Sequence, residues 1–103
     1  MKSKVAWSDQ VKEYVNSKAP DPRRRLWQEI KGLVEWDGRE NPPRFRHLED
    51  EWTGYSRVRV DRDRVIFREG IEAGRRTIFC IAAGPRNTVY ETFEELALDD
   101  LAD

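Results

Sequence analysis

Two short alternating segments joined by a tight turn constrain this chain more than any other feature of its sequence. Residues 55–60 and 64–68 alternate apolar and polar side chains, which predicts two strands that each bury one face. The turn between them is Asp-Arg-Asp at 61–63, so the strands are expected to form an antiparallel hairpin. Its buried face consists of apolar residues: Val58, Val60, Val65 and Phe67. Its opposite face carries arginines: Arg57, Arg59, Arg64 and Arg68.

The chain before the hairpin has helical rather than alternating periodicity. Ser8 is expected to cap a first helix, whose apolar face includes Val11 and Val15. Pro20 ends that helix, and the Asp-Pro pair at 21–22 begins a second one. The short break between them predicts an antiparallel helical pair. The flanking segments, residues 3–7 and 37–46, are expected to be an extended start and a loop.

The chain after the hairpin continues with further strands and then a helix. Residues 70–76 are expected to form a turn, and residues 77–83 are apolar on both faces, as a central strand is. Residues 88–90 are β-branched or aromatic and predict a last short strand. Thr92 and Glu95 have capping-box spacing, which predicts that a short acidic helix begins there.

These elements together predict an α+β fold. An N-terminal helical hairpin is expected to pack on one face of a three- to four-stranded antiparallel sheet, followed by a short C-terminal helix. A length of 103 residues suits a single domain spanning residues 1–103. Trp27, Trp36 and Trp52 are expected to be core or helix-covering residues.

Composition excludes several classes of protein. No apolar run approaches the roughly 18 residues that a membrane span needs, and no secretory signal is visible, so a cytoplasmic protein is expected. Cys80 is the only cysteine, so it forms no internal disulfide and is expected to be a buried apolar residue. One cysteine and one histidine do not make a structural zinc site, so neither a metal nor a cofactor is expected.

The net charge of −1 conceals an uneven distribution of charge. Residues 54–90 carry eight arginines and four acidic residues, whereas residues 91–103 carry six acidic residues and no lysine or arginine. An arginine-rich middle beside an acidic end indicates a local anion site rather than a generally basic nucleic-acid binder. Arginine suits phosphate, because its planar fork donates two parallel hydrogen bonds. The alternative is a solvated outer sheet face, partly neutralised by Asp61, Asp63 and Glu69.

Two segments resemble the RelE/ParE superfamily of toxins. Residues 54–68 resemble the central hairpin of that family, with its tyrosine, its two alternating basic residues and its Arg-aliphatic-aliphatic-aromatic strand. Residues 81–90 are similar to the final strand, which carries an arginine and ends in Val-Tyr. Residues 31–33 and 45–48 stand where the family has its second helix and the loop into the sheet. The resemblance covers about residues 5–91 and implies the toxin of a type II toxin–antitoxin system.

RelE-like members of the family are ribosome-dependent endoribonucleases, so the resemblance also implies an activity. They cut mRNA in the ribosomal A site by attack of a 2′-hydroxyl on the adjacent phosphorus, without a metal. The implied partners are a cognate antitoxin protein and mRNA on the ribosome, with no membrane. By position, the implied catalytic residues are Arg64 and Arg86 as transition-state clamps and Tyr90 for base stacking or proton handling. The implied phosphate-binding residues are Arg57, Arg59 and Arg68.

The chain departs from the family pattern at the hairpin. Some family nucleases have lysine as the basic pair, which can pass a proton, whereas arginine is not deprotonated in proteins. The candidates for a general base, by chemistry alone, are Glu91, Glu69 and His47. Asp63 replaces a frequent aromatic residue and is expected to pair with a neighbouring arginine.

Two other functions therefore stay open: a ParE-like inhibitor of DNA gyrase without nuclease activity, and a non-toxic adaptor with the same fold. The nuclease interpretation requires five side chains to converge on one concave patch: Arg57, Arg59, Arg64, Arg86 and Tyr90.

Overall fold

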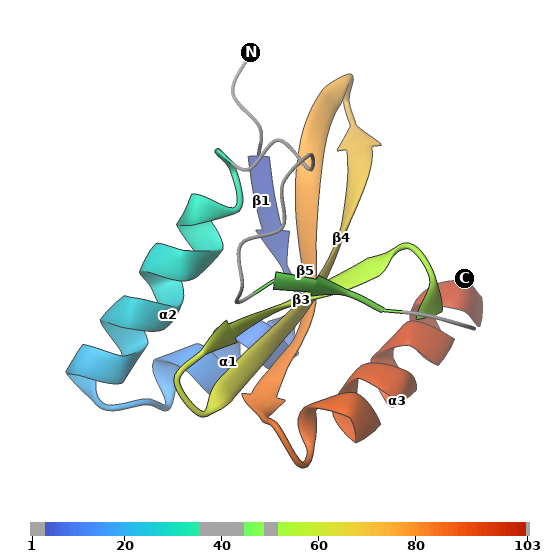
Figure 1. Cartoon of the computed structure of the whole chain (residues 1–103). Helices are drawn as coiled ribbons and strands as arrows, with labels where there is room; N and C mark the ends of the chain where they lie inside the picture. Colours follow the sequence, from blue (N-terminus) through green and yellow to red (C-terminus); the bar gives the residue numbers. More distant parts are fainter. Residues whose placement is uncertain (1–3, 36–44, 49–51, 103) are drawn as a thin grey trace.

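One five-stranded sheet runs through the molecule, with the strand order β1-β5-β4-β3-β2 (Figure 1). The computed structural model describes residues 4–35, 45–48 and 52–102. Within these residues the elements, in chain order, are β1 (Lys4–Trp7), α1 (Asp9–Asn16), α2 (Pro20–Gly32), β2 (Phe45–His47), β3 (Tyr55–Val60), β4 (Asp63–Glu72), β5 (Arg75–Pro85) and α3 (Val89–Ala102). The α+β class predicted from the sequence is confirmed.

The β3–β4 hairpin has the register that its alternation predicts. Val58 lies opposite Val65, and Arg59 lies opposite Arg64. The next connection is shorter than expected, because β4 and β5 are joined by only Ala73 and Gly74 rather than by a turn over 70–76. Both residues have positive φ, 52° and 77°, which matches the turns that suit the right-handed twist of a two-residue hairpin.

The sheet is mixed, so the expectation of a wholly antiparallel sheet is wrong. The extended start becomes β1, which runs parallel to β5, with Lys4 opposite Thr77 and Trp7 opposite Cys80. A second correction concerns the expected loop at 37–46. Phe45 already belongs to β2, an edge strand paired with β3, while residues 36–44, including Trp36, lie outside the described residues.

The helices α1 and α2 cover one face of the sheet. Ser8 caps α1 as expected, because its Oγ accepts a hydrogen bond from the Val11 backbone N–H at 3.2 Å. The same hydroxyl donates to the Ile81 carbonyl at 2.7 Å, which attaches the start of α1 to β5. The core on this face is formed by buried residues of both layers: Val11, Val15, Leu26, Ile30, Leu33, Val58, Val60, Val65, Phe67, Ile78, Cys80 and Ala83. Trp27 packs at its margin, and the predicted burial of Cys80 is confirmed.

The C-terminal helix α3 covers the other face of the sheet (Figure 1). The expected strand at 88–90 is also wrong, because α3 already begins at Val89. Val89 and Phe93 stand one turn apart on the helix and are both buried, against Ile66 and Ala82 of the sheet. Their i, i+4 spacing puts both side chains on one face of a helix. Burial of that face outweighs the β-propensity of the Thr-Val-Tyr sequence.

No helix in the described ranges is long and apolar enough to cross a membrane.

Trp52 packs against the second core, which Ile66, Ala82, Val89 and Phe93 form between α3 and the sheet. Its ring lies 4.8 Å from that of Phe93 in an edge-to-face arrangement. The tyrosine that begins β3, Tyr55, adds a second such contact at 4.9 Å. Aromatic pairs of this geometry stabilise the packing of α3 on the sheet.

Candidate phosphate-binding site

Four arginines and one tyrosine line a single cavity of about 370 Å³, which we call the arginine cavity. Its lining residues are Arg57, Arg59, Arg64, Arg86 and Tyr90. The convergence that the nuclease interpretation requires is therefore present. Tyr90 is 40% exposed, so its ring does not point into the core.

The arginine cavity is built from three parts of the chain: the β3–β4 hairpin, the turn after β5 and the first turn of α3. The alternation of β3 places Arg57 and Arg59 on the face away from α1 and α2, and the hairpin register sets Arg64 directly opposite Arg59. A turn after β5, closed by a hydrogen bond from the Thr88 N–H to the Pro85 carbonyl at 3.1 Å, carries Arg86. The first turn of α3 then presents Tyr90.

Arg64 is the buried centre of the cavity, at 7% exposure. Its Nη1 donates to two backbone carbonyls, those of Asp61 at 3.2 Å and Asp63 at 2.9 Å. Burial lowers the pKa of Arg64, and the positive charges of the other three arginines lower it further. The guanidinium of Arg64 stays charged near neutral pH, so it is a buried cation surrounded by the positive charges of the other three arginines.

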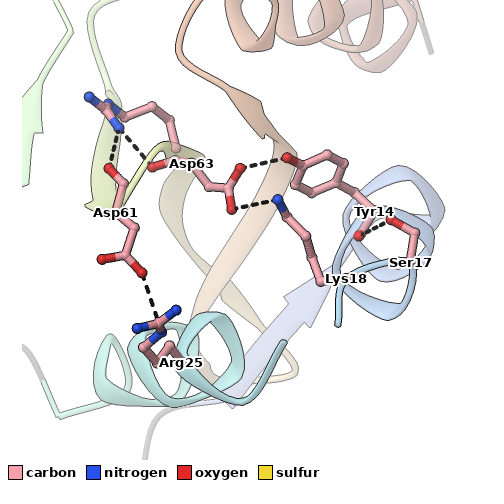
Figure 2. Close-up of polar contacts among 7 residues, drawn as sticks. Tyr14, Ser17, Lys18, Arg25, Asp61 and Asp63 are labelled. Atoms are coloured by element: carbon pink, nitrogen blue, oxygen red, sulfur yellow. Dashed lines mark hydrogen bonds and ion pairs between the residues drawn. The ribbon is translucent and has the colours of Figure 1, made fainter. Parts of the chain in front are cut away.

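The two aspartates of the hairpin turn do not neutralise this cluster. The expected pairing of Asp63 with an arginine is wrong, because its carboxylate accepts from Tyr14 Oη at 2.5 Å and pairs with Lys18 Nζ at 3.1 Å (Figure 2). Asp61 pairs with Arg25 of α2 at 3.3 Å. Within the described residues, no carboxylate lies at ion-pair distance from the four cavity arginines.

The three candidates for a general base all lie outside the cavity lining. Glu69 pairs with Arg76 at 3.0 Å. The Nδ1 atom of His47 hydrogen-bonds Ser56 at 2.7 Å, on the face of the sheet opposite the cavity. Glu91 is exposed on α3.

Arg68 is the one predicted phosphate-binding residue that the structure places elsewhere. Its guanidinium lies over the ring of Phe79, 4.3 Å from the centroid, and it lines a different cavity together with Trp7. The direct contact with an aromatic face is a cation–π arrangement, which gives Arg68 a packing partner of its own.

Two residues of the surroundings were not found from the sequence, Tyr14 of α1 and Lys18, which follows the C-cap Ser17 of that helix. Both lie far from Asp63 in the sequence, and only the fold brings them to its carboxylate. In the parts of the chain that the structure describes, no group of three or more His, Cys, Asp or Glu side chains lies close enough to hold a metal ion.

The arrangement suits a phosphodiester. Guanidinium groups from several directions donate paired hydrogen bonds to phosphate oxygens, and a partly exposed aromatic ring at the rim offers a stacking surface for a base. The fold that carries this site has a helical pair on one sheet face and a third helix on the other, with the arginine cavity beside it.

Comparisons with solved structures show that this fold is that of RelE/ParE-type toxins. The chain is similar to the YoeB/ParE toxin from Agrobacterium tumefaciens, at 13% identity and a TM-score of 0.64 over 81% of this chain and 98% of that chain. It is similar to the RelBE2 toxin–antitoxin complex from Mycobacterium tuberculosis, at 15% identity and 0.64 over 84% and 93%. A mutant of the Escherichia coli toxin RelE in the free state matches at 12% identity and 0.66 over 96% and 98%. No protein-family model and no curated protein sequence matches the chain.

Proposed function

We propose that this chain is the toxin of a type II toxin–antitoxin system and that it cleaves mRNA on the ribosome. The observation that carries the proposal is the arginine cavity, in which four guanidinium groups and a tyrosine converge without a neutralising carboxylate among the described residues. A cluster of like charges is costly unless an anion enters it, so its natural occupant is a polyanion. The likeness to RelE-type structures leads us to propose RNA as that occupant.

The proposed reaction is attack by a 2′-oxygen on the adjacent phosphorus. The bond from phosphorus to the leaving 5′-oxygen breaks, which gives a 2′,3′-cyclic phosphate and a 5′-hydroxyl. Arg64 and Arg86 stabilise the extra negative charge of the pentacoordinate phosphorane, and Arg57 and Arg59 hold the phosphate and the leaving oxygen. Tyr90 stacks on a neighbouring base, and its phenol is the one lining group that donates a proton without losing a positive charge.

The absence of a general base from the lining, within the described residues, supports dependence on the ribosome. The proton of the 2′-hydroxyl must then pass to water, and a decoding site that holds the mRNA in a reactive geometry would lower the barrier that remains. A cavity that offers cations but no general base is expected to be inactive on free RNA and to act only on RNA that the ribosome holds in place. The chain would then work in the cytoplasm, with a cognate antitoxin protein as its other partner.

The same absence favours a second candidate function. A cavity of four arginines without an acid or a histidine also fits a pure binding surface, so an inhibitor of DNA gyrase stays in view. The two functions differ in one observable, which is cleavage of mRNA.

The test is induced expression in a bacterial host, with primer extension on a reporter mRNA. The wild type is compared with Arg64→Ala/Arg86→Ala, and with the matched control Arg23→Ala/Arg62→Ala, which removes two arginines that do not line the cavity. Growth arrest with cuts inside translated codons, lost only in the cavity variant, supports the proposal. Arrest without cuts moves the function to gyrase inhibition, and growth without arrest points to an adaptor.

A further inference from the structure

We propose that Asp63, together with Tyr14 and Lys18, is a positioning device that aims the two clamp arginines from behind the sheet. The expected effect on cleavage rests on the proposed function, whereas the positioning of Arg64 by the β3–β4 turn does not. The residues involved lie on the face covered by α1, opposite the arginine cavity.

Both oxygens of the Asp63 carboxylate bind side chains of the α1 region, one from α1 and one from the segment that follows it. The residue is 6% exposed, and each of its oxygens has its own partner, Tyr14 Oη on Oδ1 at 2.5 Å and Lys18 Nζ on Oδ2 at 3.1 Å (Figure 2). A charge-assisted hydrogen bond with both partners held by packing is stronger than a neutral one. The start of β4 is thereby attached to a helix that lies in the main core.

The turn attached in this way makes contact with both clamp arginines through its backbone. The carbonyls of Asp61 and Asp63 accept from the Arg64 guanidinium at 3.2 Å and 2.9 Å. The carbonyl between them, that of Arg62, accepts from the Arg86 backbone N–H at 3.3 Å. Three consecutive carbonyls therefore set the place of two arginines that come from different parts of the chain.

The arrangement resolves a conflict in the site. Arg64 must stay inward although Arg57, Arg59 and Arg86 repel it, and a carboxylate placed in the cavity would hold it at the cost of neutralising the site. Backbone carbonyls hold the guanidinium without adding net charge, and the charge of Asp63 is matched by Lys18 on the far side. Asp63 positions Arg64 and leaves the cavity positive.

The variants that test this are Asp63→Asn, which keeps the shape and removes the charge, and Tyr14→Phe, which removes one hydrogen bond. The matched control is Asp61→Asn, which makes the same charge change in the same turn but breaks only the exposed ion pair with Arg25. Tyr14→Phe also covers the case in which Asp63→Asn fails to fold.

Two readouts separate the device from the proposed function. The first is NMR of the Arg64 side-chain N–H groups in the isolated protein. The spectra are recorded with inorganic phosphate, which stands in for the phosphate of RNA. We expect a sharp, protected Arg64 signal in the wild type and in Asp61→Asn, and a broadened or lost signal in Asp63→Asn and Tyr14→Phe. The second is cleavage of mRNA on programmed ribosomes, where a misplacement of about 1 Å costs on the order of 100-fold in rate. We expect kcat to fall by about 10- to 100-fold in Asp63→Asn, with KM changed far less.

Either an unchanged Arg64 signal in both variants or equal rates for Asp63→Asn and Asp61→Asn overturns the inference. If the wild type cleaves nothing, the proposed function fails, and the NMR comparison still decides whether the turn positions Arg64.

Discussion

Replacing Arg59 by glutamine is expected to stabilise the protein, although Arg59 lines the candidate site. The residue stands directly opposite Arg64 in the hairpin register, and both guanidinium groups line the arginine cavity. Arg59 has no ion-pair or hydrogen-bond partner among the described residues, so glutamine removes repulsion without leaving a partner unsatisfied. Glutamine also keeps much of the apolar stem of the side chain.

The expected gain is an order-of-magnitude estimate for neighbouring side chains on one face of a strand pair. At a typical separation of about 7 Å, two unit charges repel by roughly 2 kcal/mol at the effective dielectric of about 20 that suits surface pairs. Arg59 is exposed, so solvent and salt screening reduce this to about 1 kcal/mol at low ionic strength. For a domain of this size, that corresponds to a rise of about 5 °C in Tm.

The assay is thermal unfolding of the wild type and Arg59→Gln at about 20 mM and about 1 M sodium chloride, where the Debye length falls to roughly 3 Å. Arg62→Gln is the control, because Arg62 is an exposed arginine of the neighbouring turn that does not line the cavity. We expect the gain to appear at low salt, to shrink at high salt, and to be absent from the control.

A lower Tm for Arg59→Gln at low salt would refute this reasoning. So would a gain that is the same at both salt concentrations, because screening must weaken any repulsion between the two guanidinium groups. The same experiment bears on function, since a residue that destabilises the folded chain is retained at a site that binds something.

Three further outcomes are expected. Phe93→Ala should lower the free energy of unfolding by about 3–5 kcal/mol, measured by urea titration, because the ring is 1% exposed and its removal leaves a cavity under α3. Burial raises the pKa of Cys80 to about 12, so a thiol reagent at pH 8 should modify the unfolded chain and leave the folded protein unmodified over the same period. The pKa of Tyr14 is raised by burial and by its hydrogen bond to Asp63, and that of Lys18 by its hydrogen bond to Asp63. Both groups bind their protons more tightly when folded, so the stability that they contribute is present below about pH 10 and is lost as pH rises through the raised values. Urea titrations from pH 8 to 11 should show that loss in the wild type and a flatter profile in Asp63→Asn.

The hairpin and its arginines are predictable because they follow from local rules. Strict alternation over β3 and β4 sets which side chains share a face, so the pattern of residues alone groups Arg57, Arg59 and Arg64 correctly. Arg68 stands opposite Tyr55, at the other end of the hairpin from the Arg59–Arg64 pair, and its guanidinium contacts Phe79 of β5. Alternation assigns residues to a face, but it does not show which of them meet at one point along the strands.

The direction of β1 and the start of α3 are not predictable from local pattern. A strand of four residues carries no signal for its direction, because alternation shows which side chains are buried and not whether the strand runs parallel or antiparallel to its neighbour. At α3, the Thr-Val-Tyr segment favours a strand by propensity, but Val89 and Phe93 are buried together only in a helix. The contact from Tyr14 to Asp63 joins residues 49 positions apart and exists only in the folded chain.

The central claim is that the arginine cavity cleaves mRNA held on a ribosome. The most direct measurement uses purified protein, ribosomes programmed with a defined mRNA, and the same mRNA free in solution, with the ends of the products identified. The account predicts cleavage on the ribosome alone, a 2′,3′-cyclic phosphate on the upstream product, and a loss of at least about 100-fold in Arg86→Ala, the range for removing one stabilising donor. Intact mRNA on the ribosome with the wild-type protein, or equal cleavage by Arg86→Ala, would contradict it.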